Sequence, residues 1–326
     1  MVMYTEPTRA LRPTLDIAPW LDGSDKPGVA RQLDRICREI GFFYLVGHGM
    51  AEADMQAVLA QAQRFFAQTD AAKQQLAVNT ARRGYEAIAS QALDLDAPPD
   101  LKESYLLGPE LAADHPHVQA GLPNYGANLW PGEAVLPGFQ AVCEGYLQQV
   151  LTISEALMGI FALAAGEPED YFDDALVNPM ATLRMLHYPP QPHIVNNQIG
   201  CGAHTDWGAF TILLQDDTGG LEVQSADGEW LYADPVPGAF VVNLGDMMPV
   251  WTNGAYHSNG HRVRNRSPER HRYSIPFFQD MNYYTRIWCL PAFRGAGDAV
   301  DLPTRTAGEH FELMYRLTHE AAQVQA

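Results

Sequence analysis

A histidine and an aspartate stand two positions apart at His204 and Asp206, with Thr205 between them. On an extended strand, residues two apart point to the same face, so both side chains enter the same space and Thr205 faces away. An imidazole beside a carboxylate supplies two ligands of a metal site. The His-x-Asp pattern also arises by chance, so a third ligand is needed before it indicates a metal centre.

The later part of the chain offers two candidates for the third ligand. His261 lies within residues 260–263, and His257 precedes it by four residues. Either one would complete two imidazoles and one carboxylate, the facial triad of non-haem Fe(II) oxygenases, which leaves positions open on the metal. Cys201 precedes His204 by three residues, and on a regular strand this odd offset places its thiol on the opposite face. We therefore expect Cys201 to pack.

A second pair, Arg272 and Ser274, shares one face of another predicted strand. A guanidinium and a hydroxyl on one wall hold a carboxylate well, because arginine offers a permanently charged, bidentate fork. The competing interpretation is an exposed arginine on an edge strand. Arg272 follows His261 by eleven residues, which is room for the next strand, close to the metal.

The elements that must position these side chains are short strands within residues 181–290. Apolar runs alternate there with turn residues, and Asp227-Gly228 is a hairpin signal. Strands at this spacing indicate a β-sandwich or jelly roll. Amphipathic patterns add a strand and several helices: two helices within 27–69 separated by a strand at 42–46, one helix at 137–165 and one at about 306–322.

Composition describes an acidic, folded chain of 326 residues with 47% apolar and 18% charged residues. A net charge of −18 argues against nucleic-acid or anionic-membrane partners, which need clustered Lys and Arg. The longest apolar run, 156–165, is too short to span a bilayer. We see no secretory signal, and the cysteines stand far apart, so we expect a cytoplasmic location. We also expect a monomer.

Taken together, these segments resemble the Fe(II)/2-oxoglutarate-dependent dioxygenase superfamily, in the branch of isopenicillin N synthase and the plant flavonoid and gibberellin oxygenases. Matching segments run in order from about residue 14 to 320: LDIAPWL, GFFYLVGHGM, RGYEAI, DLKESYLLGPE, LPNYGANLWP, LRMLHYPPQP, HTDWGAFTILLQDDTGGLEVQ and RYSIPFF. The resemblance implies an α+β fold with a double-stranded β-helix (jelly-roll) core flanked by N-terminal, middle and C-terminal helices. It implies one catalytic domain over 1–326, with a family-type N-terminal region at 14–130 and the jelly-roll core at 181–290.

The same resemblance assigns the site. His204, Asp206 and His261 fall where the family places its iron ligands, and His257 falls at a variable position. Arg272 and Ser274 match the pair that holds the distal carboxylate of 2-oxoglutarate, and Tyr188 matches a tyrosine that lines the co-substrate pocket. The implied activity is oxidation, as hydroxylation, of a small organic molecule with O2 and 2-oxoglutarate, giving succinate and CO2. Leu186 departs from the pattern, because many plant members have Asn there.

The substrate is less well indicated. Arg83 and Tyr85 lie in a segment that flanks the substrate pocket in similar enzymes, and Trp207 and Phe278 adjoin the metal and co-substrate motifs. Asp100, Lys102 and Glu103 match a family segment that we interpret as a structural charged cluster.

Three alternatives remain. The first is an oxidase or cyclase like isopenicillin N synthase, which does not use 2-oxoglutarate. The second is a non-catalytic sensor on this fold, and the third is a metal-dependent hydrolase or isomerase. The complete triad and the arginine–serine pair argue against the second, and the length of the match argues against the third.

Overall fold

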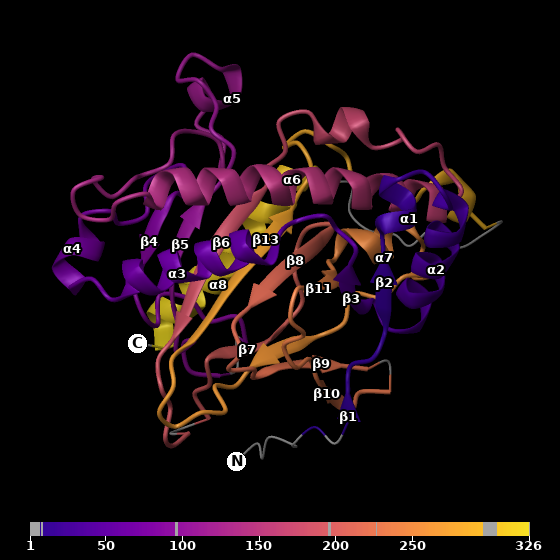
Figure 1. Cartoon of the computed structure of the whole chain (residues 1–326). Helices are drawn as coiled ribbons and strands as arrows, with labels where there is room; N and C mark the ends of the chain where they lie inside the picture. The colour runs from indigo at the N-terminus through magenta and orange to yellow at the C-terminus, as the bar shows by residue number, and fades with distance from the viewer. Residues whose placement is uncertain are drawn as a thin grey trace.

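Two facing sheets form the centre of the molecule (Figure 1). The computed structural model describes residues 7, 9–94, 97–194, 197–225, 227–295 and 305–325. In sheet order, the smaller sheet consists of β1 (Arg9–Ala10), β10 (Trp230–Tyr232), β9 (Leu221–Gln224), β12 (His261–Val263) and β7 (Cys201–His204). The larger sheet consists of β2 (Thr14–Asp16), β3 (Phe42–Val46), β11 (Phe240–Leu244), β8 (Phe210–Gln215), β13 (Arg272–Gln279), β6 (Thr182–Tyr188), β5 (Glu103–Leu107) and β4 (Gly84–Glu86).

Alternation along the strands separates two cores. On β13, for example, Ile275 and Phe277 face outward into the main apolar cluster, whereas Arg272 and Ser274 face the space between the sheets. A second, smaller apolar cluster lies in that space and includes Val223 and residues from both sheets. The functional candidates of β13 therefore point into the interior of the jelly roll.

Helices cover the outside of the larger sheet and close one end of the molecule. Their bounds are α1 (Ala18–Leu21), α2 (Lys26–Glu39), α3 (Glu52–Phe66), α4 (Asp70–Gln74), α5 (Pro116–Gln119), α6 (Phe139–Ala164), α7 (Met247–Trp251) and α8 (Ala307–Gln325), with 3₁₀ turns at Asp173–Leu176 and Pro291–Phe293. Helix α2 begins at an Asp25 cap, whose side chain accepts a hydrogen bond from the Gly28 amide at 2.9 Å.

Helix α6 lies across the outer face of the larger sheet. Phe161 stacks on Phe210 of β8 with ring centroids 5.4 Å apart, and the Ser154 hydroxyl donates to Gln279 of β13 at 2.5 Å. By length and mean hydropathy alone, α6 also meets the criteria for a membrane span, but 56% of its most apolar window is buried inside the structure. Its packing is that of a core helix.

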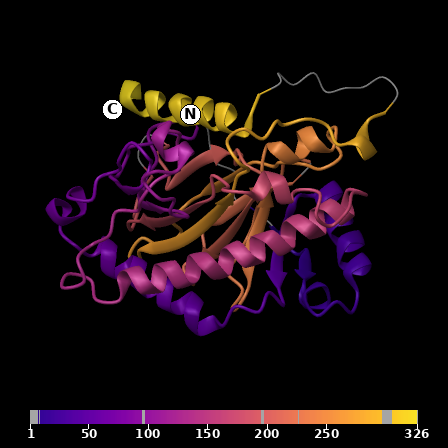
Figure 2. The same cartoon turned by 90° about the horizontal axis from the view of Figure 1, so that it is seen from above.

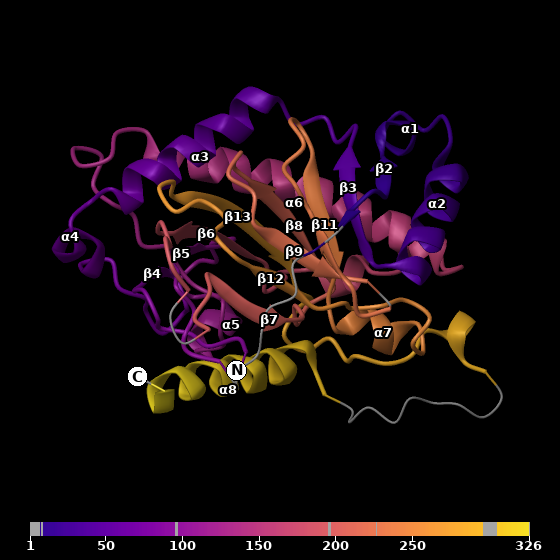
Figure 3. The ribbon, with the colours of Figure 1, turned by 90° about the horizontal axis from the view of Figure 1, so that it is seen from below.

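Helix α8 lies on the opposite side of the strands from α6, as Figures 2 and 3 show from above and below. Phe311, Tyr315 and His319 recur every fourth residue and therefore share one face of α8. These three side chains line a cavity at the end of the jelly roll.

The α+β jelly-roll prediction is confirmed, with each predicted helix present and its ends shifted by a few residues. Strands β2, β3, β4 and β5 come from residues outside 181–290 and extend the larger sheet on both sides. Residues of the 14–130 region are thus joined to the jelly roll through one continuous sheet. The division into a single catalytic domain stays a prediction.

Candidate metal centre and its two cavities

Three side chains converge at one end of the space between the sheets. The ligand atoms of His204, Asp206 and His261 all lie within 4.8 Å of one another. His204 Nε2 and His261 Nε2 lie 3.7 and 3.8 Å from Asp206 Oδ1. The two histidines face one another across the pairing of β7 and β12, and Asp206 follows in the loop after β7. His257 lies outside this group, as the resemblance implies.

Neighbouring groups orient these ligands. Asp206 Oδ2 accepts hydrogen bonds from the Thr211 hydroxyl and from the Asn243 amide, the latter at 2.7 Å, which leaves Oδ1 turned to the histidines. His204 Nδ1 lies 2.8 Å from the Gly202 carbonyl and donates to it in the neutral tautomer that keeps Nε2 as an acceptor. These contacts turn His204 Nε2 and Asp206 Oδ1 toward the same point that His261 Nε2 approaches.

Electrostatics keep the three groups in the forms that bind a metal. Burial lowers the pKa of His204 below its ordinary value, and burial together with His204 lowers the pKa of His261 to about 4. Burial acts to raise the pKa of Asp206, but His261, His204 and the Asn243 and Thr211 hydrogen bonds hold it below its ordinary value. The neutral imidazoles and ionised carboxylate are the donor set that suits Fe(II).

Cys201 differs from the sequence prediction. On β12, His261 pairs with His204 and Val263 pairs with Cys201, so three steps along β7 match two steps along β12. This β-bulge places Cys201 on the same face as His204, with its sulfur 3.8 Å from His204 Nδ1. Its side chain packs, as predicted, but against the metal centre.

One cavity, of about 60 Å³, connects the triad to Arg272 and Ser274. The Arg272 side chain is fully buried; its Nη1 donates to the Ser274 hydroxyl at 3.0 Å and its Nε to the Gly219 carbonyl at 2.8 Å. Tyr188 lines this cavity, and its ring centre lies 4.8 Å from the Arg272 guanidinium carbon. Leu186 presents an apolar side chain to the same space.

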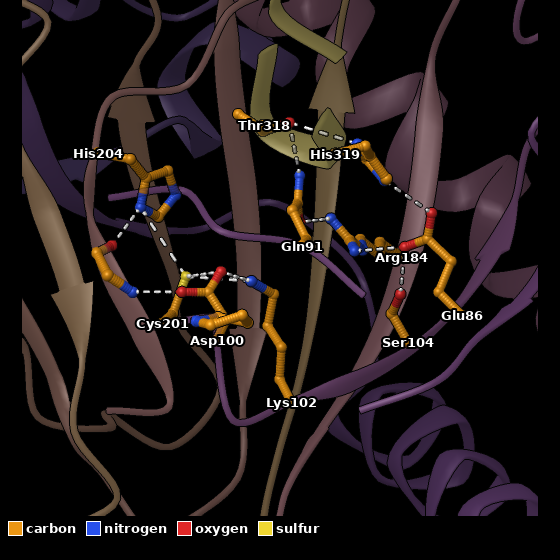
Figure 4. Close-up of polar contacts among 12 residues, drawn as sticks. Glu86, Gln91, Asp100, Lys102, Ser104, Arg184, Cys201, His204, Thr318 and His319 are labelled. Carbon is orange, nitrogen blue, oxygen red and sulfur yellow. Dashed lines mark hydrogen bonds and ion pairs between the residues drawn. The ribbon is translucent and has the colours of Figure 1, made fainter. Parts of the chain in front are cut away.

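Lys102 also lines this cavity, which the sequence analysis did not anticipate. Its buried ammonium pairs with Asp100 and donates to the Cys201 sulfur at 3.5 Å, while Asp100 accepts a hydrogen bond from the Gly202 amide at 2.8 Å (Figure 4). The predicted charged cluster is thus structural, as expected, but part of it adjoins the metal centre. Glu103 lies elsewhere, hydrogen-bonded to Tyr85 and His187.

A second cavity, of about 90 Å³, opens on the other side of His204 and Asp206, and the name chamber is used for it below. Trp207 and Phe278 line it, as predicted for substrate contacts. Arg83 and Tyr85 do not. Arg83 is fully buried away from the chamber and donates to the Asn124 carbonyl at 2.5 Å, and the Tyr85 hydroxyl donates to Glu103.

The neighbours of these two residues take their place in the chamber. Alternation turns Glu86 inward where Tyr85 faces outward, and a positive φ of 57° at Arg82 brings its side chain to the chamber. Arg184 also lines the chamber, two residues before Leu186 on β6. The alternation of β6 could have identified Arg184 from Tyr188, whereas no sequence signal marks the backbone turn at Arg82.

Comparisons with known proteins agree with this geometry. Residues 179–280 match the model of the 2OG-Fe(II) oxygenase superfamily, and residues 13–133 match the model described as non-haem dioxygenase in morphine synthesis N-terminal. A relative from Emericella nidulans, the 2-oxoglutarate-Fe(II) type oxidoreductase hxnY, is 38% identical over 95% of this chain and 91% of its own length. A homoarginine-6-hydroxylase from Oryza sativa subsp. japonica is 36% identical over 83% of this chain and 86% of its own length.

Solved structures agree as well. A full-length Neurospora crassa protein in complex with α-ketoglutarate and thymine superposes with a TM-score of 0.81 at 28% identity, over 96% of this chain and 98% of that one. The models and relatives span nearly the whole chain, and they do not favour an oxidase that works without 2-oxoglutarate. With a triad suited to Fe(II) and a buried arginine facing it, this chain belongs to the 2OG-Fe(II) oxygenase superfamily and is a 2-oxoglutarate-dependent Fe(II) dioxygenase.

Proposed function

We propose that this enzyme hydroxylates a small organic molecule in the chamber, with iron held by His204, Asp206 and His261. When bound, iron with 2-oxoglutarate and O2 supplies the oxidising power, and succinate and CO2 are the co-products. The observation that carries the assignment is the single cavity that joins the triad to the Arg272–Ser274 wall. Its two ends hold the two kinds of group that a five-carbon keto diacid needs.

Arg272 and Ser274 bind the distal carboxylate of 2-oxoglutarate in this proposal. Hydrogen bonds to Gly219, Ser274 and Gln215 fix the guanidinium, so little conformational freedom is lost when the carboxylate arrives. The Tyr188 ring packs beside the guanidinium. Leu186 offers no hydrogen bond at the position where many plant members have Asn. The Lys102 ammonium also lines this cavity and is a further polar group there.

In this proposal, the substrate lies in the chamber next to the metal but does not itself coordinate the metal. His204, Asp206 and Trp207 line its inner end, and the aromatic face of α8 covers it. An enclosure of this kind would keep water away from the reacting atoms. A volume of about 90 Å³ suits a small molecule.

The first experiment is anaerobic addition of Fe(II) and then 2-oxoglutarate to the purified protein. We expect the weak visible charge-transfer absorption of the iron–2-oxoglutarate complex, and substrate-dependent succinate formation once air is admitted. Asp206→Ala should lose iron binding, and Arg272→Ala should bind iron but lose the absorption. The exposed carboxylate variant Asp170→Ala is the control and should behave as the native protein.

Each other outcome has a distinct meaning. Iron binding without the absorption would support an oxidase like isopenicillin N synthase. Native turnover in Asp206→Ala would overturn the ligand assignment.

We further propose a cytoplasmic monomer. All of Cys37, Cys143, Cys201 and Cys289 are free thiols in the structure, which supports a reducing compartment. Size-exclusion chromatography with light scattering tests the oligomeric state.

A further inference from the structure

We propose that the chamber binds a small, planar ring acid, with its carboxylate on Arg82 and Arg184 and its ring among the aromatic side chains around α8. The inference rests on the proposed function of the chamber as the substrate site and adds the chemical class of the substrate. Four features of the chamber carry it: its aromatic side chains, its two unpartnered donors, the charge of the arginines that hold them and an unpartnered carboxyl oxygen.

Aromatic side chains line one part of the chamber. Phe311 meets Trp207 edge to face with ring centroids 5.5 Å apart, and it lies nearly parallel to Tyr315 at 6.2 Å. Phe278 of β13 adds a further aromatic side chain. Aromatic side chains favour stacked or edge-to-face contact with another ring, so a planar π system fits these walls better than a flexible chain.

Two guanidinium groups that line the chamber have buried nitrogens without a hydrogen-bond partner among the described residues. These are Arg82 Nη1 and Arg184 Nε. The remaining Arg184 nitrogens are used, because Nη1 donates to Gln91 at 3.0 Å and Nη2 to Glu86 at 2.6 Å (Figure 4). Buried donors nearly always find an acceptor, so two free ones at one cavity indicate a ligand that accepts from both.

The charge at the arginine wall of the chamber favours an anion, whereas Asp206 and Asp280 place carboxylates at its inner end. Glu86 neutralises Arg184, with which it forms a buried ion pair. Arg82 stacks on Tyr315 with its guanidinium carbon 3.8 Å from the ring centre, and Glu86 and Glu312 act on it only from longer range. One positive charge is therefore left over at this wall, and a carboxylate on the substrate supplies its counterpart.

Asp280 adds a requirement at the inner end. Its Oδ1 is buried without a hydrogen-bond partner among the described residues, and it lies against Gly208, two residues after Asp206. A carboxyl oxygen in this position calls for one N–H or O–H donor. The substrate we infer is therefore a ring with a carboxylate at one end and a donor at the other, which places the ring between the arginines and the metal centre.

The test compares three probes on the native protein with Fe(II) and saturating 2-oxoglutarate, without O2. The probes are 4-hydroxybenzoate, its neutral match 4-hydroxybenzamide and its non-planar match trans-4-hydroxycyclohexanecarboxylate. Binding is measured by calorimetry and by the change in the visible absorption of the iron–2-oxoglutarate complex. We expect 4-hydroxybenzoate to bind at least about tenfold more tightly than either comparison compound.

Variants identify the groups responsible. Arg82→Gln should remove the preference for 4-hydroxybenzoate over 4-hydroxybenzamide without changing the 2-oxoglutarate affinity. The control is Arg316→Gln, which removes an exposed arginine from α8 and should leave the preference intact. Benzoate, a further probe that lacks the hydroxyl group, should bind the native protein less tightly than 4-hydroxybenzoate, and Asp280→Ala should remove this difference.

Different results overturn different statements. The ring-acid inference would be overturned if the native protein bound 4-hydroxybenzoate and 4-hydroxybenzamide with equal affinity. It would also be overturned if homoarginine bound more tightly than either compound. Both conclusions hold whatever the variants do. Absence of the iron–2-oxoglutarate absorption before any probe is added would instead overturn the proposed function.

Discussion

At the scale of single residues, hydrogen bonds to one atom of Asp206 and one of His204 determine which of their other atoms can face a metal. Thr211 and Asn243 occupy Asp206 Oδ2, so Oδ1 is the oxygen that remains for a metal. The Gly202 carbonyl accepts a hydrogen bond from His204 Nδ1, so Nε2 is the nitrogen that remains for a metal. Such outer contacts fix the direction of each ligand before the metal arrives, and this reduces the cost of assembling the site.

The chamber wall contains a carboxylate whose ionisation stabilises the fold. Burial acts to raise the pKa of Glu86, but Arg184, His319 and Ser104 lower it to about 2, from an ordinary value of 4.5. A folded-state pKa below the unfolded one gives stability that is present above about pH 4.5 and is lost as the pH falls toward 2. Because a tenfold change in proton affinity corresponds to about 1.4 kcal/mol, Glu86 contributes roughly 3 kcal/mol at neutral pH.

Urea unfolding of the native protein and of Glu86→Gln, at several pH values, tests this prediction. The difference in the free energy of unfolding between the two should shrink as the pH falls from about 5 to about 3. The exposed variant Glu155→Gln on α6 is the control for losing a carboxylate as such. A difference that stays constant over this range would show that Glu86 does not titrate as stated.

At the scale of elements, the sequence predicts well where strands are regular and poorly where they are not. Alternation correctly placed Arg272 and Ser274 on one interior face, because β13 is a regular strand. It failed for Cys201, because the bulge in β7 changes which residues share a face. A bulge depends on pairing with a distant strand, here β12, and no local pattern reports it.

The same limit of local patterns explains why Arg83 and Tyr85, which were predicted to contact substrate, do not line the chamber. The segment containing Arg83 and Tyr85 was correctly placed beside the chamber, but the side chains that enter it are Arg82 and Glu86. The left-handed backbone at Arg82 sets this choice, and non-glycine residues adopt it too rarely to be expected from sequence. The aromatic face of α8 was visible as an amphipathic pattern, but the cavity that it lines depends on the tertiary fold.

Gly202 lies within the β-bulge of β7, between Cys201 and His204, and its lack of a side chain can be tested. A Cβ at this position would lie 2.6 Å from the Asp94 Cβ and 2.9 Å from the Asp94 backbone nitrogen, so the strand must shift to accept it. Gly202→Ala should therefore move the carbonyl that orients His204. We expect iron affinity to fall about 10- to 100-fold, the usual cost of disturbing an outer contact of a metal ligand.

Anaerobic titration with Fe(II) measures this affinity. Gly145→Ala on α6 is the matched control, because a Cβ there meets no other atom within 4 Å. Unchanged affinity in Gly202→Ala would mean that the bulge does not position His204.

At the scale of the whole molecule, the two sheets hold different halves of the site. The three proposed iron ligands come from β7, β12 and the loop that follows β7, whereas Arg272, Ser274 and Tyr188 belong to β13 and β6 of the larger sheet. In the proposed assignment, iron would tie together segments of the smaller sheet, and 2-oxoglutarate would span the interior from one sheet to the other. We therefore expect binding of the co-substrate to depend on the separation of the sheets, between which an apolar cluster is packed.

Because different sheets are proposed to hold iron and the distal end of 2-oxoglutarate, we expect each of the two to raise the Tm separately. Anything that binds only the folded protein raises the free energy of unfolding, by about 2.7 kcal/mol at a ligand concentration of 100 Kd. Anaerobic calorimetry should show one rise in Tm with Fe(II) and a further rise with 2-oxoglutarate. Arg272→Gln should keep the first rise and lose the second, His261→Ala should lose both, and the exposed control Arg270→Gln should keep both. Retention of the second rise in Arg272→Gln would show that 2-oxoglutarate does not reach the larger sheet, because Arg272 is the buried cation on that wall of the cavity.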